Sequence, residues 1–304
     1  MSRIHSLIQL EKNKIEVLHK GHKGPQIVIL TGMGCSFDEW YEVIETLSNT
    51  CRILTFHRRG LGRSDLGKEV HNTESTVCDL ADILQYFKID EPIYLVGHSY
   101  GGLCAQHFVK VYPERVAGVI LVDSTSVELK ELETLDLPII NEESDESWIK
   151  KCLDYSKKDK EELSDIIQPV LNEKQLSFPK AIQQKLLDFQ VMPSLYQAMA
   201  SEIKEWKHDA EAIKNLEFFP DVPLFVIGRD IEFTIESEKG KGIPLWELKK
   251  FEVKWSELIT DQSKLSSKSE LIFASKSGHS VFLDRPDLVI DCVHKMCNAR
   301  ITKV

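Results

Sequence analysis

The sequence predicts an α/β protein with a mostly parallel sheet and helices on both faces of that sheet. Short apolar runs of strand type alternate with amphipathic runs of helical spacing over residues 26–122, and such alternation is typical of parallel sheets. A glycine-rich turn, residues 97–102, joins one of these strands directly to a helix. The alternation stops over residues 126–215 and strands resume at residue 223.

The predicted strands are short apolar runs bounded by turn residues. Residues 6–10 and 14–18 alternate between apolar and polar side chains, which predicts an edge hairpin. The later runs are continuously apolar, as expected of strands buried on both faces. They cover residues 26–30, 51–56, 92–96, 116–122, 223–227 and 270–274.

Helices are predicted where apolar residues recur at intervals of three and four. Outside the interruption, such runs cover residues 38–47, 76–87, 103–111, 245–265 and 286–296. Within it they cover residues 148–155, 161–170 and 193–206, and no good strand occurs there. A long helical insertion between two strands predicts a cap over an active site. We therefore expect a core domain of residues 1–125 and 216–304 and a helical cap of residues 126–215.

Composition narrows the class of protein. The 304 residues allow one large domain or two small ones. With 38 basic and 48 acidic residues the net charge is −10, which argues against nucleic acid or an anionic membrane as the main partner. Seven cysteines without a Cys-x-x-Cys pair fit a reduced protein. No run approaches transmembrane length and no signal core opens the chain, so we expect a soluble, cytoplasmic protein.

The most informative segment is the glycine-rich turn. Gly97, Ser99 and Gly101 match the Gly-x-Ser-x-Gly nucleophile elbow, in the strand-turn-helix setting that this motif requires. A serine at the tip of such a turn has strained backbone geometry, and neighbours without side chains let strand and helix close on each other. The helix that follows directs N–H groups and positive dipole toward the hydroxyl. Ser99 is therefore the candidate nucleophile.

A serine hydroxyl needs a general base before it attacks a carbonyl at neutral pH. His279 is the candidate among ten histidines because it follows the last predicted strand. Catalytic groups of parallel sheets gather at the carboxyl ends of the strands, where Ser99 also lies. His98 and His107 are interpreted as packing residues. His57 ends a strand and is a pocket-lining alternative, although a structural role fits it better.

Two residues compete for the role of the acid that orients the imidazole. Asp230 follows the strand before the His279 strand, which is the more usual place in the order serine, acid, histidine. It stands only two residues after Gly228, however, and the segment beyond it looks unlike the usual loop. Asp123 sits at the end of an earlier strand. Both remain candidates. Whichever of the two is not the triad acid would cap a loop or a helix start.

An oxyanion hole completes such a site. We expect it to combine the N–H of Tyr100 with one from the glycine-rich loop after the strand at residues 26–30. Within residues 31–34 the glycines allow close backbone approach, and Met33 N–H is our choice.

At this point the chain resembles the α/β-hydrolase superfamily, in the branch with a helical cap inserted after the sixth strand. The resemblance covers nearly all of the chain. It is carried by residues 32–34, 58–64, 97–102, 278–279 and 283–286. It implies an eight-stranded, mostly parallel sheet and a Ser-His-Asp triad. It also implies Ser99 as nucleophile, His279 as base, and Met33 and Tyr100 as oxyanion donors.

Two positions depart from the pattern of that superfamily. Thr31 replaces the histidine commonly found before the first glycine of the loop, which would change how the loop is held. The irregular segment 228–230 leaves the choice of acid open. A serine at position 99 argues against relatives that need a carboxylate nucleophile.

These residues predict a serine hydrolase that acts on a small-molecule ester by acyl transfer. An amide, a thioester or a carbon–carbon bond is an alternative on the same machinery, as is a lyase or a cofactor-free oxygenase. A different class of alternative is a non-catalytic ligand-binding or signalling protein that keeps the pocket. We expect no metal and no organic cofactor, because the histidines and cysteines lack ligand spacing and no phosphate-binding loop is present.

Overall fold

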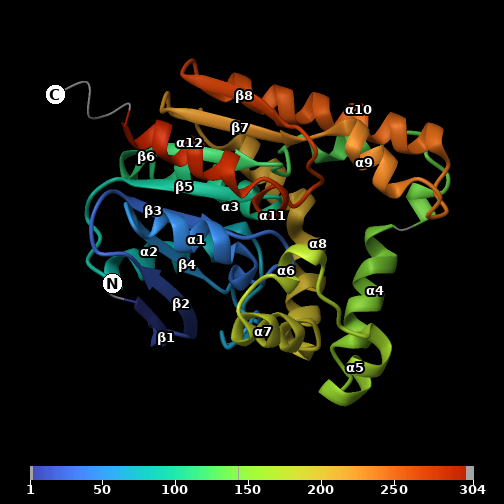
Figure 1. Cartoon of the computed structure of the whole chain (residues 1–304), viewed down its shortest axis with the longest axis horizontal. Coiled ribbons are helices and arrows are strands. Elements are labelled where there is room, and N and C mark those ends of the chain that lie inside the picture. The colour runs from blue at the N-terminus through green and yellow to red at the C-terminus, as the bar shows by residue number, and fades with distance from the viewer. Residues whose placement is uncertain (1–2, 143, 299–304) are drawn as a thin grey trace.

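The chain forms an eight-stranded sheet in which one strand runs against the others, as predicted. A computed structural model describes residues 3–142 and 144–298 (Figure 1). Within them the strand order is β1-β2-β4-β3-β5-β6-β7-β8, and only β2 runs opposite to the other strands. The strands are β1 (Arg3–Gln9), β2 (Lys14–Lys20), β3 (Gln26–Leu30), β4 (Arg52–Phe56), β5 (Ile93–His98), β6 (Val116–Val122), β7 (Leu224–Arg229) and β8 (Ser269–Ala274).

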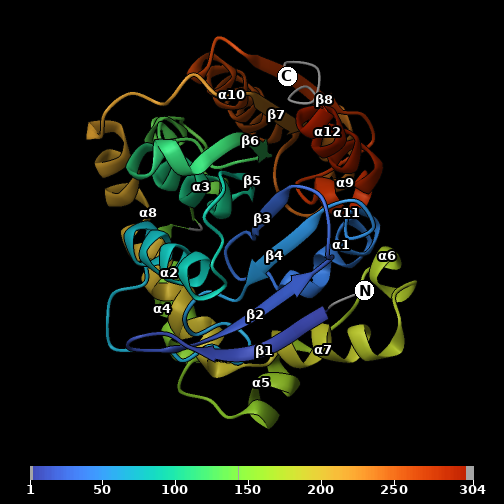
Figure 2. The same cartoon turned by 90° about the vertical axis from the view of Figure 1, so that its left-hand side faces the viewer.

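Helices cover both faces of the sheet because the central strands are apolar on both sides. On β3, Val28 packs into one hydrophobic core, whereas Ile27 and Ile29 pack into the other. Helices α2 (Thr73–Tyr86) and α3 (Tyr100–Val111) lie on the first side, and α1 (Tyr41–Leu47) and α12 (Pro286–Asn298) on the second (Figure 2). This two-residue alternation is what a pleated strand imposes on its side chains.

The strand order reverses beside β3. From β3 the chain moves outward to β4 and then returns across the sheet to β5. The loops that leave the carboxyl ends of β3 and β5 therefore turn to opposite sides, and such a switch point is where open α/β sheets hold their ligands. Both the predicted oxyanion loop and Ser99 lie here.

A helical insertion, residues 126–215, separates β6 from β7. Its helices are η3 (Leu129–Leu132), η4 (Ile140–Glu142), α4 (Asp145–Tyr155), α5 (Lys160–Ile167), α6 (Glu173–Leu176), α7 (Lys180–Gln190) and α8 (Pro193–Asn215). The insertion gathers beyond one end of the sheet (Figure 1). Helix α8 lies against the loops after β3 and β4, because a Cβ on Gly34 would come within 2.8 Å of Met199 Sδ, and one on Gly60 within 2.9 Å of Ala198 Cβ.

The remaining helices lie after β3, before β6, between β7 and β8, and after β8. They are η1 (Phe37–Trp40), η2 (Pro113–Arg115), α9 (Ile231–Glu238), α10 (Leu245–Gln262), η5 (Ser263–Leu265) and α11 (Val281–Asp284). In residues 3–142 and 144–298, no helix is both long and apolar enough to cross a membrane.

Some predicted helix boundaries are wrong for local reasons. The helix expected over residues 161–170 ends at Ile167, because Gln168 turns left-handed (φ 49°) immediately before Pro169. Helix α9 is not predicted at all. It begins where the Asp230 side chain accepts a hydrogen bond from Phe233 N, at 3.1 Å.

The first turn of α3 packs so closely on the end of β3 that position 101 tolerates only glycine. A Cβ at Gly101 would lie 2.2 Å from Leu30 O and 2.5 Å from Thr31 O. We expect Gly101→Ala to lower the free energy of unfolding by about 1–3 kcal/mol, the usual range for overpacking, as measured by urea denaturation. The control is Gly278→Ala, whose Cβ meets nothing closer than Asp284 Oδ2 at 3.7 Å. Equal unfolding midpoints for the two variants would contradict this reading of the packing.

Candidate active site

Ser99 sits at the tip of a strained turn between β5 and α3. Its backbone has φ 52° and ψ −124°, in a region that non-glycine residues rarely adopt. Three backbone hydrogen bonds hold it there: Ser99 N donates to Val122 O (3.2 Å), and Ser99 O accepts from Gly102 N (2.9 Å) and Thr125 N (3.1 Å). The residue is half-buried. The surroundings thus fix a strained serine at the carboxyl edge of the sheet.

Asp123 contacts His279. Its Oδ2 lies 2.6 Å from His279 Nδ1, which leaves Nε2 of the ring available for another partner. Asp123 directly follows β6, has a positive φ of 40° and is fully buried. Two other side chains hold the carboxylate: Trp255 Nε1 donates to Oδ1 at 2.9 Å, and Arg229 Nη1 donates to Oδ2 at 3.2 Å. The backbone N–H of Arg229 also donates to Oδ1, at 3.2 Å.

The charge of Asp123 is strongly stabilised. Burial alone would raise its pKa, but the hydrogen bond from His279 and the positive charge of Arg229 outweigh burial and lower the pKa to about 2. The carboxylate is therefore ionised at any pH near neutrality. An ionised acid on the far nitrogen of an imidazole fixes its tautomer and stabilises the imidazolium.

Asp230, the other candidate acid, does not contact His279. Its carboxylate accepts hydrogen bonds from Phe233 N at 3.1 Å and Lys276 N at 2.9 Å. The Lys276 bond and the other backbone donors lower the pKa of Asp230. Because β7 ends at Arg229, the next residue already caps helix α9. The structure therefore brings Asp123 to the histidine and leaves Asp230 as a helix cap.

The segments that carry Ser99 and His279 meet through His98. The ring of His98 is hydrogen-bonded through Nε2 to His279 O at 3.0 Å, and the two imidazoles lie 4.7 Å apart between centroids. Burial and the neighbouring His279 lower the pKa of His98 to about 3, so it is neutral. Among the described residues no hydrogen bond joins Ser99 Oγ to His279. Catalytic hydrogen bonds are often formed only when substrate binds.

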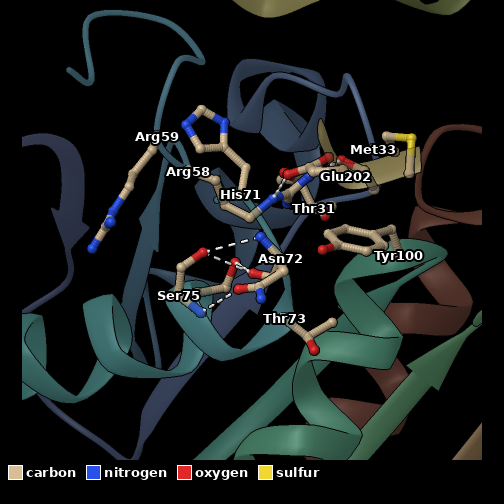
Figure 3. Close-up of polar contacts among 12 residues, drawn as sticks. Thr31, Met33, Arg58, Arg59, His71, Asn72, Thr73, Ser75, Tyr100 and Glu202 are labelled. Atoms are coloured by element: carbon tan, nitrogen blue, oxygen red, sulfur yellow. Dashed lines mark hydrogen bonds and ion pairs between the residues drawn. The ribbon is translucent and has the colours of Figure 1, made fainter. Parts of the chain in front are cut away.

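The two expected oxyanion donors lie on adjoining segments. Tyr100 opens α3, whose next residue packs on the carbonyl groups of Leu30 and Thr31 at the end of β3. Met33 follows two residues later, and Figure 3 shows Met33 and Tyr100 on the same side of the Thr31 loop. Within the part of the chain that the structure describes, neither N–H finds a hydrogen-bond acceptor.

A mostly apolar cavity of about 400 Å³ is lined by neighbours of Ser99 and His279, although neither of these two residues lines it. Thr125, whose N–H binds Ser99 O, and Trp255, whose ring edge faces His279 at 5.9 Å, both line it. Trp206 of α8 and Phe251 of α10 add aromatic surface. Lys207 in this cavity pairs with Asp145 at 2.7 Å and with Glu133, which offsets charge at its rim. No cluster of three or more potential metal ligands occurs among the described residues.

Several residues around the site escape prediction from sequence. Trp255 lies mid-way along α10, and helical spacing does not indicate which strand end its indole reaches. For Arg229 the sequence did contain a signal. The residue follows Gly228 at the end of β7, which places it at the carboxyl edge of the sheet. Besides Asp123 it binds Glu252, at 2.8 and 2.6 Å. Arg58 and Glu202 form a further buried pair beside the oxyanion loop.

Comparison with known proteins places the chain in one fold group. Residues 25–162 match the family model described as "alpha/beta hydrolase fold". A solved thermophilic esterase from Thermogutta terrifontis superposes with a TM-score of 0.64 at 18% identity, over 98% of this chain and 99% of that chain. Matches below 25% identity establish the fold alone.

Two curated relatives match by sequence. A Hormonema carpetanum protein named "Probable transporter efuK" is 26% identical over 88% of this chain and 38% of its own length. The 2-hydroxy-6-oxo-2,4-heptadienoate hydrolase of Pseudomonas putida is 28% identical over 49% of this chain and 54% of its own length. The chain thus spans about half or less of the relatives that it matches.

The lowered pKa of Asp123 predicts a pH-dependent contribution to stability. A carboxyl whose pKa falls from 3.8 to about 2 on folding stabilises the protein above pH 4 and loses that contribution as the pH falls toward 2. We expect the stability difference between wild type and Asp123→Asn to narrow by about 1 kcal/mol between pH 5 and pH 3, in urea denaturation followed by circular dichroism.

Asp209→Asn supplies a control of opposite sign. Burial raises the pKa of Asp209 to about 6, so its protonated form favours the folded state and that contribution is lost as the pH rises through 6. Wild type should therefore gain stability relative to Asp209→Asn as the pH falls from 6 to 4. The same slope for both variants would contradict the assignment for Asp123.

Proposed function

Because the chain has the α/β-hydrolase fold and residues 25–162 match the family model of that fold, we propose that it is a serine hydrolase that cleaves an ester-type bond in a small organic substrate through an acyl-enzyme. The observation that carries the proposal is the 2.6 Å hydrogen bond between buried Asp123 and His279, beside the strained Ser99. This chemistry is supported by three residues that are far apart in the sequence: a nucleophile, a base and an acid that orients the base. Together they are stronger support than any single motif.

In the proposed reaction, Ser99 Oγ attacks the substrate carbonyl while His279 Nε2 takes the hydroxyl proton. Asp123 stabilises the resulting imidazolium through Nδ1–H. The oxyanion accepts hydrogen bonds from Met33 N–H and Tyr100 N–H, and the dipole of α3 adds to their effect. The imidazolium then protonates the departing alcohol. Water, activated by the same imidazole, releases the acid and restores Ser99.

The cavity beside His279 supports a substrate with an apolar portion. Its lining combines Trp206, Phe251 and Trp255 with aliphatic side chains, and about 400 Å³ suits a small organic group. An ester is the proposed bond because an alkoxide leaves more easily than an amine anion and so depends less on protonation by His279.

A second candidate within the same machinery is cleavage of a carbon–carbon bond. It is favoured by the match to the Pseudomonas putida relative. The substrate in the printed name of that relative contains a ketone and no ester, so its hydrolysis must break a carbon–carbon bond. An activity panel of esters and dienoate ketones would separate the two candidates.

Removal of the nucleophile should abolish turnover. We expect Ser99→Ala to lower hydrolysis of short-chain p-nitrophenyl esters by at least about a thousandfold, with the circular dichroism spectrum unchanged. Wild type should also be labelled by a fluorophosphonate probe, whereas Ser99→Ala should not. Absence of labelling in wild type would favour a non-catalytic ligand-binding protein, and labelling of the Ser99→Ala variant would place the nucleophile elsewhere.

The two aspartates should differ sharply in their effect on catalysis. Asp123→Asn leaves His279 without an ionised partner, and we expect kcat to fall by about ten-thousandfold. Asp230→Asn keeps a side chain that caps helices as well as aspartate does, so kcat should stay within about threefold of wild type. Steady-state kinetics on one p-nitrophenyl ester would measure both, and similar losses in the two variants would exclude Asp123 as the acid.

A further inference from the structure

Arg58, directly after β4 and His57, lies between the oxyanion loop and the helical insertion. Its guanidinium donates from Nη1 to Thr31 O at 2.7 Å and from Nη2 to Gly32 O at 3.0 Å (Figure 3). Its carbon Cζ also lies 5.1 Å from the centroid of the Tyr100 ring. Arg58 thus contacts both segments that supply the expected oxyanion donors, and it is only 4% exposed.

The partner of Arg58 comes from the insertion. Glu202 of α8 is 1% exposed, and its two oxygens accept from Arg58 Nε at 2.6 Å and Nη2 at 3.1 Å. Burial would lower the pKa of Arg58, but the Glu202 carboxylate raises it, so the guanidinium stays charged. Such a two-point pair fixes orientation as well as distance.

Peptide geometry links this pair to the candidate oxyanion donor. Gly32 O and the N–H of Met33 belong to the same planar unit, and in a trans peptide they point in opposite directions. Holding Gly32 O against Arg58 therefore directs Met33 N–H away from Arg58. Gly32 O also accepts a longer hydrogen bond from Cys35 N, at 3.3 Å, so Arg58 supplies the shorter of the two contacts that hold this peptide.

We propose that Arg58 and Glu202 are a positioning pair that sets the direction of Met33 N–H and makes the oxyanion hole depend on the docking of helix α8. The proposal rests on the serine-hydrolase function proposed above. Neither residue touches the reacting atoms, since both act through the backbone of the Thr31–Met33 loop.

The chain supplies a matched control in the next residue. Arg59 is 9% exposed and pairs with Asp79 of α2, at 2.9 and 2.7 Å, and it also contacts the more exposed Glu69 at 3.2 Å. It makes no hydrogen bond to the oxyanion loop or to α8 among the described residues. Loss of the Arg59 pair removes a comparable charge interaction, so it measures the structural cost alone.

The test compares two double variants that remove each pair without leaving a lone buried charge: Arg58→Met with Glu202→Met, and Arg59→Met with Asp79→Leu. We expect kcat for a p-nitrophenyl ester to fall about a hundredfold in the first, the usual loss for one oxyanion donor, with KM within about threefold. Affinity for an arylboronic acid, which forms a tetrahedral adduct on serine, should fall in proportion. The Arg59 variant should lose less than about threefold in kcat.

Arg58→Lys is the second variant should the double one fail to fold. A lysine holds one carbonyl but not two together with a bidentate carboxylate, so an intermediate loss of kcat is expected. Equal losses of kcat and boronate affinity in the Arg58 and Arg59 variants would overturn the positioning role.

Hydrogen exchange separates this inference from the proposed function. The Cys35 amide donates to Gly32 O at 3.3 Å, so it should exchange faster in the Arg58 variants than in the Arg59 variant, whether or not the protein hydrolyses any ester. An inactive wild type that no fluorophosphonate labels would contradict the proposed function, yet faster exchange would still support the positioning of the loop. Unchanged exchange of the Cys35 amide would overturn it.

Discussion

Burial of the Asp123 carboxylate is the constraint on which the carboxyl edge of the sheet depends. A charge taken out of water is costly unless several donors compensate it. Here the donors come from three different parts of the chain: His279 after β8, Arg229 at the end of β7, and Trp255 in α10. Satisfying this one carboxylate therefore sets the position of His279 and ties α10 to the ends of β6 and β7. The backbone of Asp123 also has a positive φ, which is an unfavourable conformation for this residue.

The outcome for the two aspartates shows which part of the site was predictable. Strand ends could be placed from apolar runs, and this was enough to bring Ser99, His279 and Asp123 to one edge. Asp230 lies at that edge as well, and only the helix α9 that starts behind it turns its carboxylate to Phe233 N and Lys276 N. That helix is short and weakly amphipathic, so the spacing of its apolar residues does not predict it. Local hydrogen bonding, rather than the order of residues in the chain, decided between the candidates.

The fold itself was more accessible to sequence than the surroundings of the site. Continuous apolar runs and helical spacing determine the sheet order within narrow limits, because buried strands and crossover helices allow few topologies. The contacts of the insertion follow no such rule. Glu202 and Trp206 lie on one long helix, α8. Their spacing indicates that they share a face of the helix, but it does not predict which loop of the core that face contacts. The pairing of Glu202 with Arg58 depends on how α8 docks, which is a property of three-dimensional packing.

The buried contact between Arg58 and Glu202 also limits how the insertion could be exchanged. Residues 126–215 look like a self-contained block between two strands, and a chimaera that replaced them would join cleanly at both ends. Such a graft would nevertheless leave the buried Arg58 guanidinium without a partner unless it carried an acidic side chain opposite it. A change at position 202 of the insertion is thus coupled to position 58 in the core, so the two positions must change together.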